Sequence, residues 1–184
     1  MSRRTIVFLD SGDTLVNEAT EQRNGEGIVI RAEMIDGAKE AVSELYEAGY
    51  TLALVADGRK ISFENMFRQH NLAHCFAAWS ISETVGAEKP ARAMFQTAMD
   101  LLGLTSGDKP RIAMVGNNLR KDIAGANRFG IRSVLLRWSP RYDMTPHASD
   151  ESPDYVIDMP GELPALIARL EAEVQSLPTL FTQR

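Results

Sequence analysis

Short apolar runs alternate along this chain with longer stretches whose apolar residues recur at helical spacing. The runs are bounded by polar or Gly-containing turns, which is typical of strands buried on both faces of a parallel sheet. We expect strands over residues 6–9, 50–56, 76–81, 111–116 and 133–136, with residues 155–157 as a candidate edge strand.

The intervening stretches predict helices over residues 36–48, 62–70, 90–102, 121–129 and 160–174. Pro90 fits the first turn of its helix, and Gly49 and Gly130 fit the ends of theirs. Residues 16–32 are polar and contain glycines, so we expect a loop or short hairpin, whereas residues 139–154, with three prolines, predict an irregular surface loop. Strands alternating with helices favour a parallel sheet with helices on both faces.

The composition limits the function classes. A length of 184 residues suits one domain, 1–184, and an apolar content of 44% allows a sizeable core. The net charge of −5, without a Lys/Arg cluster, argues against nucleic-acid binding. The single cysteine, Cys75, excludes an internal disulfide and fits a reducing compartment. Since no apolar run is long enough to span a membrane, we expect a soluble, cytoplasmic protein.

Polar residues follow three of the expected strands. Asp10 comes directly after the first, Asp57 after the second, and Asn117 with Asp122 after the fourth. A parallel sheet gathers these ends on one edge, where ligands bind in open α/β sheets. Lys89 lies just before a helix and could add a cation. Carboxylate and amide oxygens suit Mg²⁺, and an ammonium group suits phosphoryl oxygens.

Four segments, taken together, resemble the motifs of the haloacid dehalogenase superfamily. They are residues 10–15 (DSGDTL), 54–58 (LVADG), 85–90 (VGAEKP) and 115–122 (VGNNLRKD), and they occur in the order that the family has. The resemblance covers nearly the whole chain. It implies an α/β three-layer sandwich around a parallel five-stranded sheet in the order 3-2-1-4-5.

The resemblance also implies a mechanism. Asp10 would be the nucleophile that attacks phosphorus and forms an aspartyl-phosphate. Lys89 would neutralise the crowded carboxylate and phosphate oxygens. Backbone N–H groups around Ala56, Asp57 and Gly58 would hold the phosphate.

A Mg²⁺ cofactor is implied in the same way. Its ligands would be the carboxylate of Asp10, the backbone carbonyl of Gly12, and Asn117 and Asp122 of the fourth motif.

Three positions depart from the family pattern. Gly12 stands where phosphatases of the family carry an aspartate that transfers protons, and Asp13 is one residue too late to replace it. A Gly12→Asp substitution is therefore expected to speed hydrolysis. Ala56 stands where a Ser or Thr hydroxyl binds phosphate, and Asp57 adds a negative charge near an anion site. Asn117 replaces an acidic metal ligand.

The spacing between motifs leaves no room for an inserted cap domain. Relatives without a cap act on bulky phosphoesters or use a neighbouring subunit as a lid, so the resemblance leaves a bulky substrate and a homo-oligomer open. Trp138, Arg141 and Tyr142, at the start of the predicted 139–154 loop, are candidates for lining the mouth of the site.

The favoured function is a Mg²⁺-dependent phosphohydrolase that is slow or narrow in substrate. The alternative is a catalytically idle protein of the same fold that binds a phosphorylated ligand or a partner protein. In that case Asp10 and Lys89 could form a buried ion pair, and Asp122 could simply stabilise the start of its helix.

Overall fold

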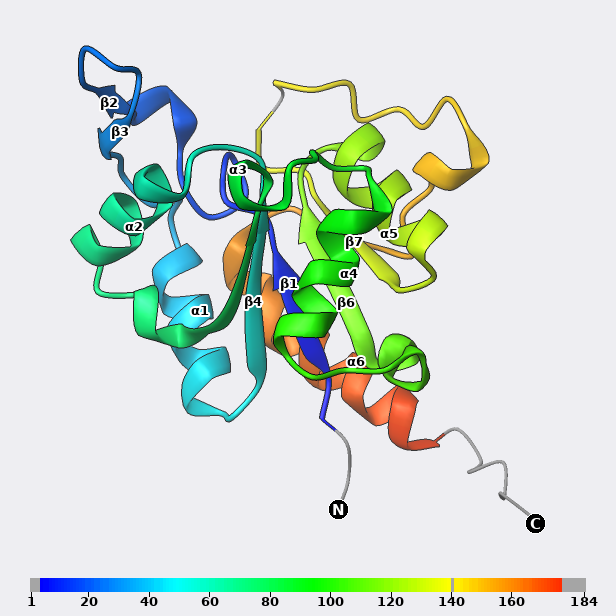
Figure 1. The fold of residues 1–184 in the computed structure, drawn as a ribbon. Coiled ribbons are helices and arrows are strands. Elements are labelled where there is room, and N and C mark those ends of the chain that lie inside the picture. The colour runs from blue at the N-terminus through cyan, green and yellow to red at the C-terminus, as the bar shows by residue number, and fades with distance from the viewer. Residues whose placement is uncertain (1–3, 140, 177–184) are drawn as a thin grey trace.

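The computed structural model describes residues 4–139 and 141–176 and contains a six-stranded parallel sheet between two layers of helices (Figure 1). The sheet order is β5-β4-β1-β6-β7-β8. The five predicted strands therefore have the expected order, and the candidate edge strand is present as β8. The strands are β1 (Ile6–Leu9), β4 (Thr51–Ala56), β5 (Phe76–Ile81), β6 (Ile112–Gly116), β7 (Arg132–Leu136) and β8 (Tyr155–Ile157).

The helices cover the two faces of the sheet because the central strands are apolar on both sides. Val7 and Leu9 face the layer made by α1, α2 and α6, whereas Ile6 and Phe8 face α4 and α5. All four side chains are at most 2% exposed. The helices are α1 (Ala38–Glu47), α2 (Lys60–Gln69), α3 (Ser82–Val85), α4 (Arg92–Leu101), α5 (Ala124–Phe129) and α6 (Leu163–Ser176).

Several predicted helix starts were wrong in detail, including those expected at residues 36 and 62, which lie at Ala38 and Lys60. The helix expected from residue 90 begins at Arg92, and Pro90 lies in the turn before it, after a cis Lys89–Pro90 bond. The stretch expected as one helix from residue 121 starts as a π-helical turn, Leu119–Ile123, and continues as α5. The last helix is preceded by a 3₁₀ turn, Pro160–Glu162. Each difference lies at a helix start, where tertiary contacts compete with local preference.

The polar segment 16–32 contains the hairpin β2 (Gln22–Arg23) and β3 (Val29–Arg31), which lies beside α2 (Figure 1). The backbone of Val29 donates to the hydroxyl of Ser62 over 3.1 Å and accepts from the amide of Asn65 over 3.0 Å. Side chains of α2 thus satisfy the open edge of the hairpin and fix it next to the carboxyl end of the sheet.

No helix in the described part of the chain is long and apolar enough to cross a bilayer.

Candidate active site

Asp10 follows the last residue of β1 and lies between the ends of two neighbouring strands. In the register of the sheet, Leu9 pairs with Leu54 of β4 and with Val115 of β6. The backbone N–H of Asp10 donates to the carbonyl of Val115 over 3.0 Å, which extends the ladder by one residue. The carboxylate of Asp10 therefore sits at the carboxyl edge of the sheet, where open α/β sheets bind ligands.

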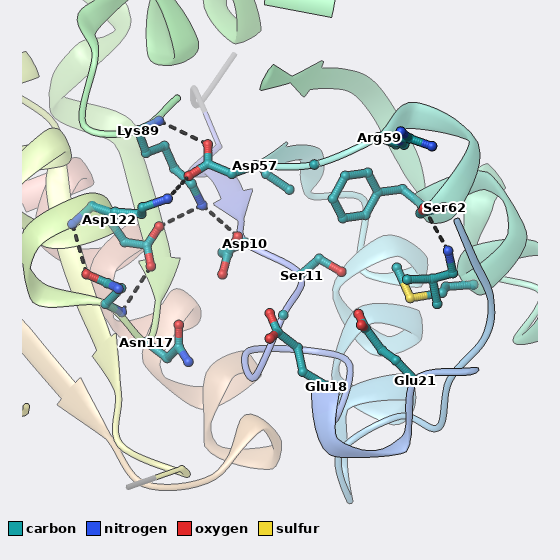
Figure 2. Close-up of a pocket in the computed structure, with 18 of the residues that line it drawn as sticks. Asp10, Ser11, Glu18, Glu21, Asp57, Arg59, Ser62, Lys89, Asn117 and Asp122 are labelled. Carbon is teal, nitrogen blue, oxygen red and sulfur yellow. Dashed lines mark hydrogen bonds and ion pairs between the residues drawn. The ribbon is translucent and has the colours of Figure 1, made fainter. Parts of the chain in front are cut away.

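Lys89 joins two carboxylates that are far apart in the sequence. Its ammonium nitrogen lies 2.6 Å from Oδ1 of Asp10 and 2.7 Å from Oδ1 of Asp122 (Figure 2). Burial alone would lower the pKa of Lys89, but the charges of Asp10, Asp122 and Asp57 outweigh it and raise that pKa above its usual value. A permanently charged, buried ammonium group thus lies beside the candidate nucleophile.

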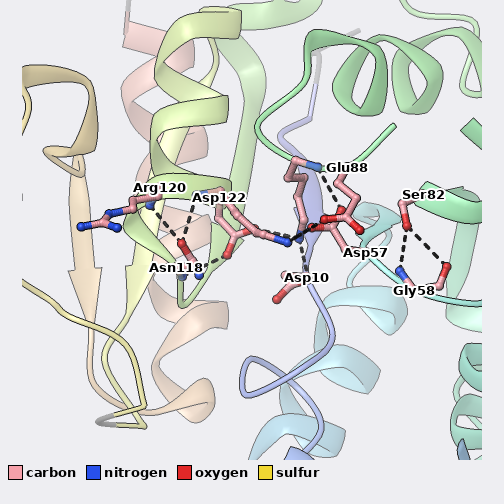
Figure 3. A network of polar contacts seen from close by, with 10 residues as sticks. Asp10, Asp57, Gly58, Ser82, Glu88, Asn118, Arg120 and Asp122 are labelled. Atoms are coloured by element: carbon pink, nitrogen blue, oxygen red, sulfur yellow. Dashed lines mark hydrogen bonds and ion pairs between the residues drawn. The ribbon is translucent and has the colours of Figure 1, made fainter. Parts of the chain in front are cut away.

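Asp122 is placed by the π-helical turn Leu119–Ile123, a structure that is frequent at functional sites. The backbone N–H of Asn118 donates to Oδ2 of Asp122 over 3.0 Å (Figure 3). Gly116 leaves room for this approach, since a Cβ there would lie 2.3 Å from Oδ2 of Asp122. Burial raises the pKa of Asp122 to about 6, against the opposing attraction of Lys89.

A cavity of about 290 Å³ opens in front of these groups, between the carboxyl edge of the sheet, the hairpin and α2. Three buried polar atoms in its wall have no hydrogen-bond partner among the described residues: Oδ1 of Asp122, which is ion-paired with Lys89, and the hydroxyl of Ser11 and the amide nitrogen of Asn117, which have no ion pair either. Figure 2 shows the Ser11 side chain pointing into the space between Asp10 and α2. Buried polar groups are nearly always satisfied in folded proteins, so unused ones in a cavity wall indicate a polar ligand.

The oxygen atoms around Asp10 fit a magnesium ion. Mg²⁺ binds through one or two carboxylates and completes its shell with water and substrate oxygens. Asp10 and Asp122 would supply the carboxylates, and Gly12 and Asn117 line the same cavity. Because the two ends of an Asn amide can exchange by a flip, the unpartnered end of Asn117 can present its oxygen. Within residues 4–139 and 141–176 no three His, Cys, Asp or Glu side chains are grouped for metal binding, so amide and backbone oxygens would have to contribute.

Asp57 lines the cavity, but its carboxylate is engaged away from the nucleophile. Oδ1 accepts the backbone N–H of Lys89 over 3.0 Å, and Oδ2 accepts the ammonium of Lys121 over 2.8 Å (Figure 3). The negative charge expected to disfavour an anion is therefore paired with Lys121, a residue that the sequence did not single out.

Two of the expected phosphate contacts are weak in this structure. Ala56 is 1% exposed and carries no hydrogen-bonding side chain. The N–H of Gly58 already donates to the hydroxyl of Ser82 over 2.8 Å. The hydroxyl of Ser11, which has no partner among the described residues and lines the same cavity, is a candidate phosphate contact that motif matching alone did not reveal.

Asp13 lies in the turn after Asp10 with a left-handed backbone, φ 49°. Its Oδ1 accepts the backbone N–H of Glu18 over 3.1 Å, and its Oδ2 accepts Nη1 of Arg141 over 3.1 Å. The carboxylate of Asp13 therefore connects two loop segments and is not directed at Asp10.

Glu18 is the main functional candidate that the sequence did not reveal. It begins a 3₁₀ turn capped by Asn17, lines the cavity, and forms an ion pair with Arg141. Burial raises the pKa of Glu18, Arg141 lowers it, and the nearby carboxylates of Asp13 and Asp10 raise it further. The only local signal was an N-cap residue followed by an acid within an otherwise irregular stretch.

The loop after β7 contributes to the site in part, because Tyr142 borders the cavity whereas Trp138 and Arg141 border a neighbouring hollow. Tyr142 lines the cavity, and Arg141 binds Asp13 and Glu18. Trp138 is only partly buried and packs against the core. Pro140 lies outside the described residues.

The family model described as haloacid dehalogenase-like hydrolase matches residues 12–136. Among curated proteins, the chain is 37% identical over 128 residues to a glyceraldehyde 3-phosphate phosphatase of Methanopyrus kandleri, covering 69% of this chain and 53% of the relative. It is 29% identical over 161 residues to a phosphoglycolate phosphatase of Aliivibrio fischeri, and the match covers 86% of this chain and 68% of the relative. The chain thus spans about half the length of the first of these relatives.

Solved structures share the fold. A putative HAD-hydrolase, YfnB of Bacillus subtilis, superimposes with a TM-score of 0.72 at 17% identity, covering 90% of this chain and 99% of that one. An uncharacterized protein of Listeria monocytogenes serotype 4b gives a TM-score of 0.73 at 20% identity, covering 91% and 99%. At these identities the similarity establishes the architecture alone.

Proposed function

Because the chain belongs to the haloacid dehalogenase-like hydrolase family, we propose that it hydrolyses phosphate monoesters through an aspartyl-phosphate on Asp10. The observation that carries the proposal is the position of Asp10 at a strand end, facing a polar cavity, with Lys89 2.6 Å away. The curated relatives named as phosphatases support the same reaction class.

Asp10 is oriented for attack by its neighbours. Lys89 binds Oδ1, and Oδ2 accepts a hydrogen bond from the hydroxyl of Thr14 over 3.3 Å. The long contact to Thr14 leaves Oδ2 the more available oxygen for bond formation with phosphorus. The ammonium of Lys89 then offsets the charge that accumulates as the carboxylate and the phosphoryl oxygens approach each other.

A Mg²⁺ ion held by Asp10, Asp122 and Asn117, with the carbonyl of Gly12, would supply positive charge to the phosphoryl oxygens. The hydroxyl of Ser11 would donate to one of those oxygens, in place of the hydroxyl missing at Ala56. Both assignments use groups that already line the cavity.

The proposed substrate is a small phosphorylated compound rather than a bulky one. A volume of about 290 Å³ lies just below the roughly 300–1,000 Å³ typical of ligand sites. Glu21, just before β2, Arg23 of β2 and Arg59, just before α2, border the cavity and add both signs of charge. A leaving group rich in hydroxyl or carboxylate groups would suit such a wall.

Turnover of a panel of small phosphoesters with Mg²⁺ tests the proposal. We expect phosphate release by the wild type and none by Asp10→Asn, which keeps the shape of the side chain but removes the nucleophile. A beryllium fluoride complex that binds with Mg²⁺, without turnover of any ester, would favour the non-catalytic alternative. No binding and no turnover would contradict both.

A further inference from the structure

Position 12 has no side chain, yet the space beside it is filled. A Cβ built on Gly12 would lie 1.8 Å from Oε1 of Glu18 and 2.7 Å from its Cδ. The backbone of Gly12 does not have a left-handed φ, so its conformation would accept another residue. The carboxylate of Glu18 therefore occupies the volume in which a side chain at position 12 would begin.

Contacts from two directions hold Glu18 there. Its backbone N–H donates to Oδ1 of Asp13, and the side chain of Asn17 caps the 3₁₀ turn that Glu18 begins. Its Oε2 binds Nη1 of Arg141, which also binds Oδ2 of Asp13 over 3.1 Å. Because Arg141 engages Oε2, Oε1 is the atom turned toward Gly12.

Glu18 faces the same cavity as the candidate nucleophile. Figure 2 shows its carboxylate directed toward Asp10 and Ser11, and all three residues line the cavity. Like Asp57 and Asp122 of the same wall, which pair with Lys121 and Lys89, Glu18 pairs with a cation, and it does so through Oε2. Glu18 thus places one carboxylate oxygen beside position 12, where the family pattern has an aspartate and this chain has no side chain.

We infer that Glu18 is the acid/base catalyst of this site. A residue six positions after Gly12 thus transfers the protons that the family's aspartate at position 12 would transfer. This inference rests on the proposed phosphohydrolase function. It also gives Arg141 and Asp13 a definite role as positioning residues, since Arg141 binds the carboxylate of Glu18 and Asp13 binds both Arg141 and the backbone N–H of Glu18.

In the first step, a carboxylate oxygen of Asp10 forms a bond to phosphorus while the bond from phosphorus to the ester oxygen breaks. The departing oxygen keeps that electron pair and takes a proton from Oε1 of Glu18. The products are an alcohol, the aspartyl-phosphate and an ionised Glu18.

In the second step, ionised Glu18 takes a proton from a water molecule whose oxygen forms a bond to phosphorus. The bond from phosphorus to the oxygen of Asp10 breaks, and the electron pair returns to the Asp10 carboxylate. Inorganic phosphate leaves and Glu18 carries a proton again, so the sum of both steps is ester plus water giving alcohol plus phosphate.

Glu18→Gln tests this because it keeps the size of the side chain and removes proton transfer. With an alkyl ester such as glycerol 2-phosphate, we expect turnover to fall by about 10²–10⁴-fold, the usual contribution of acid/base catalysis. With p-nitrophenyl phosphate, whose leaving group needs no proton, the first step should remain fast and the second become slow. One equivalent of nitrophenolate should then appear in a burst, and acid-quenched protein should carry one phosphoryl group in mass spectrometry.

The double variant Gly12→Asp/Glu18→Gly relocates the carboxylate to the position at which the family pattern has it. We expect it to recover at least tenfold over Glu18→Gln with glycerol 2-phosphate. Glu33→Gln is the matched control, because it removes an exposed carboxylate from the same segment outside the cavity, and it should keep the wild-type rate.

The outcomes separate the two proposals. A wild type that is indistinguishable from Asp10→Asn would overturn the phosphohydrolase function and, with it, the role of Glu18. An active wild type would overturn only the role of Glu18 if Glu18→Gln kept its rate on glycerol 2-phosphate. The same holds if Glu18→Gln lost both steps equally, with no burst and no phosphoryl-protein, because that pattern is expected of a purely structural residue.

Discussion

The ammonium nitrogen of Lys89 lies 2.6 Å from Oδ1 of Asp10, although 78 residues separate the two in the chain. Lys89→Met keeps an unbranched side chain but leaves Asp10 and Asp122 as buried carboxylates without a cation between them. Removing one partner of a buried ion pair costs about 3–5 kcal/mol. We therefore expect Lys89→Met to lower the free energy of unfolding by about that amount, measured by urea denaturation, and to abolish ester hydrolysis.

Lys60→Met is the control for that measurement. Lys60 is exposed and lies 3.7 Å from Glu64 one helical turn on, so its loss should change the free energy of unfolding by no more than about 0.5 kcal/mol. If Lys89→Met were as stable as the wild type, Asp10 and Asp122 could not both be ionised in the folded protein.

The central strands could be predicted because each is marked by features that lie close together in the sequence. Residues 6–9 and 51–56 are almost continuously apolar, as strands covered on both faces must be, and the motif resemblance supplied their order. The start of the helix at Arg92 could not be predicted from Pro90. Proline suits a turn as well as a first helical turn, and here the N–H of Ala91 closes a turn onto Glu88.

The missed parts of the site depend on contacts between distant segments. Glu18 is held in place by Arg141, 123 residues later, and Asp57 is neutralised by Lys121. Neither pair leaves a local pattern. The motif comparison predicted a deficit at Gly12, and the folded chain places the Glu18 carboxylate in the space beside it.

Gly12→Asp alone should therefore lower the rate of ester hydrolysis, whereas the sequence led us to expect a higher rate. The new Cβ would lie 1.8 Å from Oε1 of Glu18, so the Glu18 side chain must leave its place. Two carboxylates would then compete for one site. We expect a loss of about 1–3 kcal/mol in the free energy of unfolding, the usual cost of overpacking, and no gain with glycerol 2-phosphate. A faster single variant would show that Glu18 yields its position at no cost.

Magnesium should stabilise the protein through Asp122. At ten times its Kd, a ligand that binds only the folded state adds about 1.4 kcal/mol, which thermal denaturation detects as a rise in Tm. Asp122→Asn removes one of the two proposed carboxylate ligands and should abolish the rise. Asp36→Asn, which removes an exposed carboxylate before α1, should retain it. An equal rise in the two variants would mean that Mg²⁺ binds elsewhere.

The hydroxyl of Ser11 should matter for binding and not for folding. It is buried and unpartnered among the described residues, so Ser11→Ala removes no hydrogen bond from the folded protein. We expect a free energy of unfolding equal to or above that of the wild type. If the hydroxyl binds the phosphoryl group, Ser11→Ala removes one hydrogen bond to phosphate, which contributes about 0.5–1.5 kcal/mol to binding. Inhibition by inorganic phosphate should then weaken by about two- to twelvefold. Unchanged phosphate inhibition would exclude Ser11 from the phosphate site.

Asp108 provides a test of stability away from the active site. Its Oδ2 accepts the backbone N–H and the hydroxyl of Thr105 over 2.8 Å and 3.0 Å, and its Oδ1 accepts Nε of Arg111 over 3.1 Å. The backbone hydrogen bond from Thr105 lowers the pKa of Asp108 below its usual 3.8, and the contacts of Arg111 add to this against the effect of burial.

A folded-state pKa below the unfolded value means that the ionised carboxylate contributes stability above about pH 3.8 and loses it as the pH falls below that value. Asp108→Asn keeps the shape without the charge, so we expect it to cost about 1 kcal/mol near pH 7. The difference from the wild type should shrink steadily in urea denaturation as the pH approaches about 2. Asp158→Asn, which breaks an exposed ion pair with Arg137, should cost at most about 0.5 kcal/mol throughout. If the loss of unfolding free energy in Asp108→Asn did not change with pH, the contribution of Asp108 to stability would come from the shape of its side chain alone, because only the charge titrates in this range.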